Sequence, residues 1–357
     1  MSTYVIAEAG VNHNGSMDLA RDLIEVAAEA GVDAIKFQTF QTEEVVTNDA
    51  SKADYQSETT DARESQADML RNLELGLDQH EAITEYCEEC DVQFLSTPAD
   101  VDSAQFLVDS FGVPRIKIGS GELTNGPFLL EVARLGKPVI LSTGMGTLGE
   151  VEQALGVLAY GYVKKESRPE KMDLERAFAS DEGQSALESN VTLLHCITEY
   201  PAPVEAANLR AMGTLEQAFG LPVGLSDHTM GTTVPTAAVA RGATLIEKHF
   251  TLDRSLSGPD HEASLEPEEL AEMVENIRCV ESALGDPRKV PREPEWENRS
   301  AVRRSLVASK PIEKGDRFTT NNLAAKRPGG GISPMEYWKT IGKTSSKSYK
   351  KGELINE

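Results

Sequence analysis

Short apolar runs recur along the first 285 residues of the chain. Each run is rich in residues that favour strands, and it is followed by a turn containing Gly, Ser, Thr, Asn or Asp and then by a stretch with helical spacing. Residues 18–30 and 267–284 show that helical spacing clearly. The eight runs are Val5–Glu8, Ala34–Phe37, Gln93–Ser96, Arg115–Ile118, Val139–Ser142, Thr192–Cys196, Val223–Ser226 and Leu245–Lys248.

This alternation predicts an α/β fold with a parallel sheet, because strands joined through helices run in the same direction. Eight units in about 285 residues match the size of a (β/α)8 TIM barrel. A doubly wound open sheet is the alternative. The first turn, Gly10–Gly15, argues against it because it lacks the glycine spacing of a dinucleotide-binding fingerprint.

Two connections are too long to be simple turns. They span residues 41–78, after the second run, and residues 161–190, before the sixth, and both are polar and rich in charge. We expect loop or helical insertions that cover the barrel mouth or build a subunit contact.

Composition divides the chain into three parts. We expect residues 1–285 to form the barrel and residues 286–299, with three prolines and many charges, to form a linker. Residues 300–357 predict a compact unit of short strands and turns. Such a unit is too small for a robust core of its own, so we expect it to dock onto the barrel.

The charge of the chain is strongly uneven. It carries 58 acidic and 35 basic side chains, a net charge of −23, which excludes a nucleic-acid binder held by bulk charge. Residues 1–299 hold 23 basic and 53 acidic side chains, a net of −30, whereas residues 300–357 hold 12 basic and 5 acidic, a net of +7. The opposite signs predict a salt-sensitive attraction between barrel and tail.

Cysteine content and hydropathy bear on location. Four cysteines in 357 residues make a poor disulfide framework, which favours a reducing cytoplasm. Cys87 and Cys90 lack the second pair that a zinc site needs, and we expect two reduced thiols. No apolar run approaches the roughly 20 residues that cross a bilayer, so no membrane segment is expected.

Polar side chains stand at or just past the end of every run. In a barrel these carboxyl ends converge on one mouth, where catalysis takes place, and we expect the site there. The residues are Glu8, Lys36, Gln38, Ser96, Thr97, Lys117, Ser120, Glu122, Ser142, Thr143, His195, Thr198, Tyr200, Ser226, Asp227, His228, Glu247, Lys248 and His249.

The types of these side chains indicate a chemistry. His228 and His249 leave neighbouring strands and suit an open site for Mn²⁺ or a similar ion, with water and substrate oxygens as further ligands. Lys36 and Lys117 need an anion if buried, and the glycine-rich turns near them offer N–H donors to phosphate or carboxylate. A small phosphorylated acid is therefore favoured as ligand. The candidate bases and hydroxyl acceptors are Glu8, Glu122, Glu247 and Asp260.

Nine motifs occur in order: AEAGVNHNG from residue 7, IKFQT from 35, KIGSGE from 117, LSTGM from 141, LHC from 194, GLSDHT from 224, IEKHFT from 246, GPDH from 258 and KRPG from 326. Together they resemble the sialic acid (nonulosonic acid) synthase family almost end to end. The resemblance implies a barrel followed by an antifreeze-like (SAF) domain. It also implies a domain-swapped homodimer in which each tail covers the partner's barrel.

The resemblance also implies a role for each matching residue. His228 and His249 would bind the metal, Mn²⁺ with Mg²⁺ or Co²⁺ as alternatives. Phosphoenolpyruvate would be bound by Lys36, Thr97, Lys117, Ser120, Ser142 and Ser226. An N-acylated mannose-type sugar would be bound by Gln38, Glu122, Tyr200, Glu247, Asp260 and, from the tail, Arg327. The catalytic residues would be Glu8, Lys36 and Lys117.

The implied reaction is an aldol-like condensation. C3 of phosphoenolpyruvate attacks the aldehyde of the open-chain sugar, water adds at C2, and phosphate leaves by C–O cleavage to give a nine-carbon 2-keto-3-deoxy acid. We assign the proton and water chemistry to Glu8.

One departure concerns the acceptor sugar. Thr198 stands where well-known sialic acid synthases carry Asn, and the sequence Thr198–Pro201 looks more like the legionaminic acid synthases. The acceptor is therefore either N-acetylmannosamine or 2,4-diacetamido-2,4,6-trideoxymannose. The alternatives in function are a 3-deoxy-ulosonic acid synthase that uses a sugar phosphate and a non-catalytic sugar-binding protein.

Overall fold

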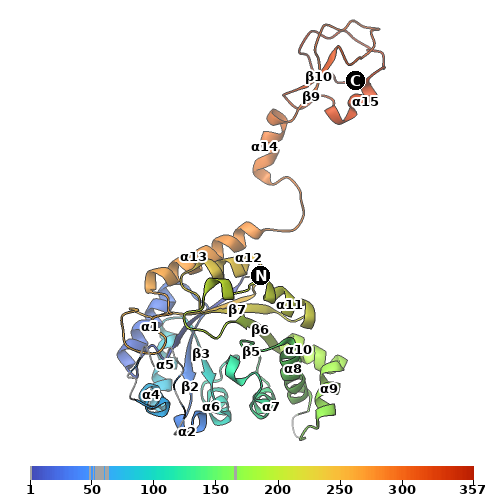
Figure 1. The fold of residues 1–357 in the computed structure, drawn as a ribbon. Helices are drawn as coiled ribbons and strands as arrows, with labels where there is room; N and C mark the ends of the chain where they lie inside the picture. The colour runs from blue at the N-terminus through green and yellow to red at the C-terminus, as the bar shows by residue number, and fades with distance from the viewer. Residues whose placement is uncertain (1, 48–49, 51, 53–59, 61–63, 165–166) are drawn as a thin grey trace. The chain divides into compact units, whose positions relative to one another are not determined.

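A computed structural model describes residues 2–47, 50, 52, 60, 64–164 and 167–357. The chain splits into two compact units, Met1–Gly285 and Asp286–Glu357, each considered by itself (Figure 1).

The first unit is the predicted (β/α)8 barrel. Its parallel strands pair in the order β3-β2-β1-β8-β7-β6-β5-β4, and β3 and β4 lie side by side to close the circle, with no ladder between them among the described residues. The strands are β1 (Tyr4–Gly10), β2 (Ala34–Thr39), β3 (Gln93–Pro98), β4 (Ile116–Ile118), β5 (Val139–Ser142), β6 (Val191–Cys196), β7 (Val223–Asp227) and β8 (Leu245–His249). β5 has the bounds of its predicted run, and each of the other strands differs from its run by one to three residues at its ends.

One principal helix follows each strand and packs outside the sheet (Figure 1). Local capping fixes several of their starts: Ser16 accepts from the backbone N–H of Leu19, and Asp100 from that of Ser103. The helices are α1 (Met17–Glu29), α5 (Leu77–Glu89), α6 (Val101–Phe111), α7 (Gly126–Arg134), α8 (Leu148–Val163), α11 (Arg210–Phe219), α12 (Thr233–Ala240) and α13 (Pro267–Leu284).

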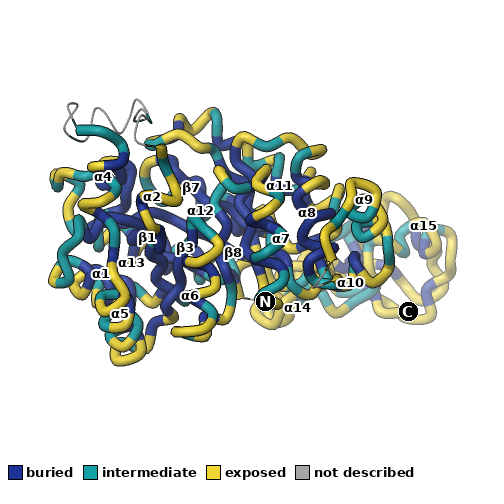
Figure 2. Tube along the Cα trace, turned by 90° about the horizontal axis from the view of Figure 1, so that it is seen from below, coloured by how far each residue is buried: buried dark blue, intermediate teal, exposed yellow. Residues whose placement is uncertain are grey.

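Strand alternation separates two hydrophobic layers. Residues such as Val5, Ala7 and Phe37 face the helices in the main core. Their neighbours in sequence face the barrel axis, where a smaller cluster of Ile6, Ala34, Leu95, Ile140, Leu194 and Leu245 fills the interior. The strands therefore form the buried centre, while the outer faces of the helices are exposed (Figure 2).

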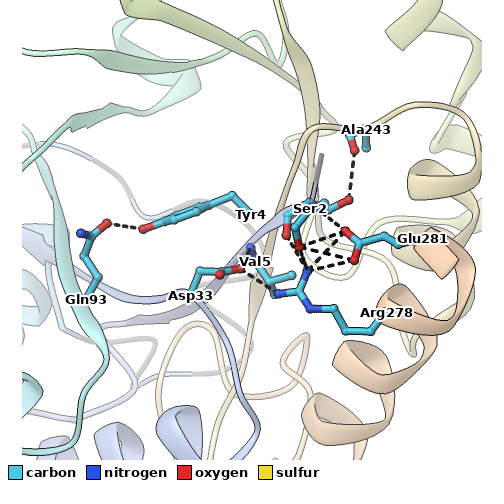
Figure 3. A network of polar contacts seen from close by, with 9 residues as sticks. Ser2, Tyr4, Val5, Asp33, Gln93, Ala243, Arg278 and Glu281 are labelled. Atoms are coloured by element: carbon cyan, nitrogen blue, oxygen red, sulfur yellow. Dashed lines mark hydrogen bonds and ion pairs between the residues drawn. The ribbon is translucent and has the colours of Figure 1, made fainter.

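A polar network joins the chain start to α13 (Figure 3). The Arg278 guanidinium donates to Asp33 Oδ2 at 2.9 Å and to the carbonyl of Thr3 at 2.7 Å. Asp33 Oδ2 also accepts from the N–H of Val5 at 2.7 Å. These contacts tie β1, α13 and the turn before β2 together at the amino-terminal end of the strands.

Both long connections contain helices. Residues 41–78 form α2 (Thr42–Val45), α4 (Gln66–Leu73) and the start of α5, with the remainder partly outside the described residues. Residues 161–190 contain the end of α8, then α9 (Lys171–Ala179) and α10 (Asp181–Asn190). Short 3-10 turns occur at Ser120–Glu122 and Val204–Ala206.

The second unit has its own small core. An antiparallel pair, β9 (Ser305–Ala308) and β10 (Leu323–Lys326), packs with Ile312, Phe318, Tyr349 and Ile355. It also contains α14 (Glu293–Val302), a 3-10 turn at Pro334–Glu336 and α15 (Tyr337–Thr340). Helix α14 covers much of the segment expected to be a linker. Its first turn is favoured by Pro294 and by the Glu295 side chain, which accepts from the backbone N–H of Arg292.

All four cysteines are free thiols. Cys87 is buried in α5, and burial raises the pKa of its thiol. Across the described part of the chain, no helix combines the length and apolar character needed to span a membrane.

Candidate active site

A pocket of about 230 Å³ opens at the carboxyl ends of the strands. It brings together thirteen of the fifteen residues that the sequence assigns to the site, namely Glu8, Lys36, Gln38, Thr97, Lys117, Ser120, Ser142, Tyr200, Ser226, His228, Glu247, His249 and Asp260.

The alternation of the strands explains this convergence. Ile6 points to the barrel axis, so Glu8, two residues later, points the same way one layer higher. Ala34 and Lys36 on β2 repeat the relationship, as do Leu245 and Glu247 on β8. The apolar interior layer therefore forms the floor of the pocket, and the polar layer above it forms the site.

Lys36 lies at the centre of the charges. Its Nζ is 2.5 Å from Glu8 Oε2, 2.8 Å from Thr97 Oγ1 and 3.6 Å from Glu247 Oε2. The Lys36, Glu8 and Glu247 side chains are each no more than 5% exposed. Burial acts to lower the pKa of Lys36, but the effect of the two carboxylates is larger and the pKa is raised. The ammonium group is therefore charged.

Glu247 is the second centre. Its Oε1 lies 3.2 Å from Lys117 Nζ and accepts from Ser226 Oγ at 2.9 Å. Burial acts to raise the pKa of Glu247, but Lys117 and Lys36 outweigh it and lower the value to about 2. Glu247 is therefore an anion at neutral pH.

Glu8 is tuned in the opposite direction. Burial raises its pKa to about 7, against the opposing effect of Lys36, and the negative charge of Glu247 raises it further. Two carboxylates beside one lysine thus have well-separated pKa values, an arrangement typical of sites that need one proton carrier and one fixed charge. Glu8 is therefore the member of this pair whose charge changes near neutral pH.

The two predicted metal ligands face one another. The rings of His228 and His249 have centroids 5.5 Å apart, and Tyr200 stacks on His228 with centroids 4.0 Å apart. The carbonyl of Ile197 lies 2.6 Å from His228 Nδ1, so that nitrogen carries the proton and Nε2 keeps its lone pair. Burial lowers the pKa of His228 to about 4 and that of His249 well below its usual value.

This arrangement fits a divalent ion. His249 Nδ1 is buried without a hydrogen-bond partner in the described structure, and Asp260 Oδ2, at 3.9 Å, is too distant to supply one. Neutral imidazoles are the form that binds metal. No group of three or more His, Cys, Asp or Glu side chains among the described residues is placed to hold a metal, so the remaining ligands would come from water and substrate.

Hydroxyls and glycines line the wall opposite the imidazoles. Ser120 Oγ accepts from the N–H of Gly144 at 3.0 Å and lies 3.0 Å from Cys196 Sγ. A Cβ at residue 144 would lie 2.4 Å from Thr198 Oγ1 and 2.7 Å from Cys196 Sγ, so only glycine fits there. Ser142 Oγ is buried with no hydrogen bond to any described residue, which makes it available to a ligand.

Several residues expected at the mouth do not line the pocket. On each strand they lie next to a residue that faces the barrel axis, so their own side chains point the other way, toward the helices. Asp227 and Lys248 pair with each other, His195 Nε2 bonds the carbonyl of Ala207, and Thr143 Oγ1 donates to the carbonyl of Leu194. Ser96 likewise bonds Thr39.

Two of the assigned sugar-binding residues also lie elsewhere. Glu122 accepts from Asn125 Nδ2 beside the pocket, and Arg327 is an exposed residue of the second unit. The pocket also contains residues without a predicted role: Val11, Met69, Leu70, Leu73 and Cys196. Alternation along β6 could have indicated Cys196. Residues 41–78 were expected to cover the barrel mouth or to build a subunit contact, and α4 lines the pocket, but no sequence signal indicated which of its residues do so.

A barrel whose mouth combines two lysines, several hydroxyls and paired imidazoles defines a (β/α)8 enzyme that handles an anionic substrate. Residues 23–289 match the NeuB family and residues 303–357 match the SAF domain. The chain belongs to the NeuB family. The resemblance to sialic acid synthases and the predicted barrel with its SAF domain are thereby confirmed, and the chain is an enzyme of that family.

Three similar proteins illustrate the relationship. The N,N′-diacetyllegionaminic acid synthase of Campylobacter jejuni is 47% identical, with 99% of both chains covered. That of Legionella pneumophila is 41% identical, covering 99% of this chain and 94% of its own. The solved N-acetylneuraminic acid synthetase of Leptospira borgpetersenii, in complex with citrate, is 32% identical, with a TM-score of 0.68 over 84% of this chain and 90% of its own.

Proposed function

We propose that this chain condenses phosphoenolpyruvate with an open-chain N-acylated mannose-type sugar to give a nine-carbon 2-keto-3-deoxy acid and phosphate. The observation that carries the proposal is the convergence of two buried lysines, three serine hydroxyls and two neutral imidazoles in one pocket. Similarity to curated legionaminic acid synthases supports it.

The anionic substrate would lie between the lysines. Lys36 and Lys117 would bind the carboxylate and phosphate of phosphoenolpyruvate, with Ser120, Ser142, Ser226 and Thr97 as hydroxyl donors. Glu247 contacts both ammonium groups, so it holds them toward the pocket centre. These contacts fix the orientation of the three-carbon substrate before the sugar reacts.

His228 and His249 would hold the divalent ion, which we propose to be Mn²⁺, with Mg²⁺ or Co²⁺ as alternatives. When bound, that ion supplies a Lewis acid to the aldehyde of the sugar. The Ile197 carbonyl keeps His228 in the tautomer that such binding requires.

Glu8 would carry the proton. With a pKa of about 7, it can donate to the aldehyde oxygen as the new C–C bond forms. The resulting carboxylate can then accept a proton from the water that adds at C2, after which phosphate leaves with the C–O bond electrons. Each step is within reach of one carboxyl group beside Lys36.

The sugar would occupy the rest of the pocket. Gln38, Tyr200 and Asp260 line that side, and Glu247 lies between the two substrates. Glu122 would join them from beside the pocket, and Arg327 from the SAF domain of a partner chain in a domain-swapped homodimer. The acceptor is N-acetylmannosamine or 2,4-diacetamido-2,4,6-trideoxymannose, and the enzyme would work in the cytoplasm.

The test is phosphoenolpyruvate consumption by purified protein. Each of the two sugars is supplied with and without Mn²⁺, and arabinose 5-phosphate is a third acceptor. We expect phosphate release with at least one N-acylated sugar and loss of it on chelation. Turnover of arabinose 5-phosphate alone would instead identify a 3-deoxy-ulosonic acid synthase, and binding without turnover of any acceptor would contradict the enzyme assignment.

A further inference from the structure

One side of the active-site pocket is apolar. Met69, Leu70 and Leu73 of α4 line it together with Val11, whereas Lys36, Lys117 and the serine hydroxyls line the pocket at the strand ends. The pocket therefore has a charged half at the strand ends and an apolar half supplied by the connection between β2 and α5. We call Met69, Leu70 and Leu73 the α4 wall.

The α4 wall is firmly held. Met69 and Leu73 are 4% and 7% exposed and form a cluster with Val11 and Phe40, against which Leu70 also packs. Ser65 caps the helix by accepting from the N–H of Asp68.

Hydrogen bonds and close packing anchor the C-terminal end of α4. Glu74 Oε2 accepts from both the N–H and the hydroxyl of Thr42. A Cβ at Gly15 would lie 2.7 Å from the carbonyl oxygen of Asn72, so the loop after β1 packs directly on α4. The wall is therefore a packed surface of fixed shape.

The position of the reacting atoms decides which part of a sugar meets this wall, and this step depends on the proposed function. The aldehyde carbon must lie near Glu8 and the imidazoles, and phosphoenolpyruvate takes the lysines and serines. The acceptor chain can then extend past Gln38 and Pro259 toward α4, which lines the same pocket. Its distal carbons, from C4 to C6, would face Met69, Leu70 and Leu73.

The wall offers nothing to a polar distal end. Among the described residues that line the pocket, Lys36 and Lys117 are the only lysines or arginines, and each is already paired with a carboxylate. Against the α4 wall, a phosphate at C6 would lose water without gaining a cation from the barrel, and a hydroxyl would lose hydrogen bonds. A methyl group at C6 or an acetamido methyl at C4 would gain apolar contact.

We propose that the α4 wall is the specificity-determining surface for the acceptor, selecting a 6-deoxy, 4-acylamino sugar over a hydroxylated or phosphorylated one. A hydrophobic surface discriminates against one added hydroxyl by up to about 100-fold in kcat/KM. Discrimination against a 6-phosphate is expected to be larger, because a charge costs more to desolvate than a hydroxyl.

The experiment compares kcat/KM for 2,4-diacetamido-2,4,6-trideoxymannose, N-acetylmannosamine and N-acetylmannosamine 6-phosphate at saturating phosphoenolpyruvate. Leu70→Gln is the main variant because Leu70 is half-buried and tolerates change better than Met69. Leu70→Met is the conservative control, and Arg71→Gln changes the exposed neighbouring residue on the same helix.

We expect the wild type to prefer the trideoxy sugar, Leu70→Gln to reduce that preference at least tenfold, and both controls to keep it, with the KM for phosphoenolpyruvate unchanged throughout. Equal kcat/KM values of the wild type for N-acetylmannosamine and the trideoxy sugar would overturn the inference while leaving the proposed function intact. This comparison needs no variant. An unchanged preference in an active Leu70→Gln would also overturn it. If no N-acylated sugar supports turnover, the proposed function fails and the wall loses its role.

Discussion

Asp227 and Lys248 form a buried ion pair immediately before the two facing imidazoles. Lys248 Nζ lies 2.5 Å from Asp227 Oδ2, and the two side chains are 0% and 2% exposed. The residues are register partners on β7 and β8, and Lys248 also donates to the carbonyl of Thr229. The pair thus ties the two strand ends that carry His228 and His249.

Replacing Lys248 with Met should destabilise the fold strongly, because it leaves the Asp227 carboxylate buried without its cation. The expected loss is about 3–5 kcal/mol in the free energy of unfolding, measured by urea denaturation. The double variant Asp227→Asn/Lys248→Met should recover part of it, and Arg71→Gln, at an exposed pair, should change nothing measurable. A Lys248→Met protein within 1 kcal/mol of wild type would contradict this role.

Glu8→Gln should abolish turnover and leave the fold intact. The amide keeps the shape of the side chain but cannot carry a proton between the aldehyde and water, so kcat should fall at least about 100-fold. The circular dichroism spectrum should match that of wild type. A kcat near that of wild type would contradict the assignment of proton transfer to Glu8.

Stability should fall in acid through His13. This ring is fully buried, its Nδ1 accepts from the N–H of Gly15, and burial, with the charges of His80 and His261 adding, lowers its pKa to about 4. The unfolded chain, with a histidine pKa near 6.5, binds the proton more tightly. The stabilisation is therefore complete above pH 6.5 and is lost as pH falls toward 4, by roughly 3 kcal/mol at most.

The measurement is unfolding free energy against pH for wild type and His13→Asn, whose side-chain oxygen can still accept from Gly15. We expect the variant to lose less stability than wild type between pH 6.5 and 4. Parallel curves for the two proteins would rule out His13 as a source of the acid sensitivity.

Arg278→Met should lower stability without affecting catalysis. The guanidinium donates hydrogen bonds to Asp33 and to the Thr3 carbonyl, at the end of the strands opposite the pocket (Figure 3). Losing these partly exposed bonds should cost about 1–2 kcal/mol by thermal or urea denaturation. A kcat/KM that changes more than twofold at 25 °C would mean that the two ends of the barrel are coupled.

The proposed domain swap predicts complementation between two inactive chains. Glu8→Gln disables a barrel and Arg327→Ala a tail, and a swapped heterodimer contains one site with an intact barrel and an intact tail. Mixing, dissociating and reassociating the two proteins should restore about a quarter of wild-type activity. No recovery, despite heterodimers detected by native mass spectrometry, would show that each tail serves its own barrel.

The barrel was predictable because its signals are local. Each strand is an apolar run bounded by turn residues, and Pro267–Leu284 reproduces α13 as the structure has it. The site was predictable for the same reason, since residues at the carboxyl end of a strand in such a fold lie at the mouth. Glu8, Lys36 and Glu247 were found in this way.

The errors have two physical sources. Asp227, Lys248 and His195 were expected at the mouth because position along the chain was considered without the two-residue alternation that turns them outward. The connection of residues 41–78 was expected to cover the mouth or to build a subunit contact, but Met69, Leu70 and Leu73 were not identified, because which side chains reach the pocket depends on how this connection folds back.

The ionisable side chains above the pocket floor have a consequence for inhibitor design. Lys36 contacts both Glu8 and Glu247, and Lys117 contacts Glu247, so an anionic group that enters this pocket shares its two cations with buried carboxylates. One carboxylate and one phosphate, as in phosphoenolpyruvate, would occupy both lysines, so further carboxylates on a lead compound should bring little affinity. Shape-matched groups that bond the free Ser142 hydroxyl and contact Leu70 offer a better starting point.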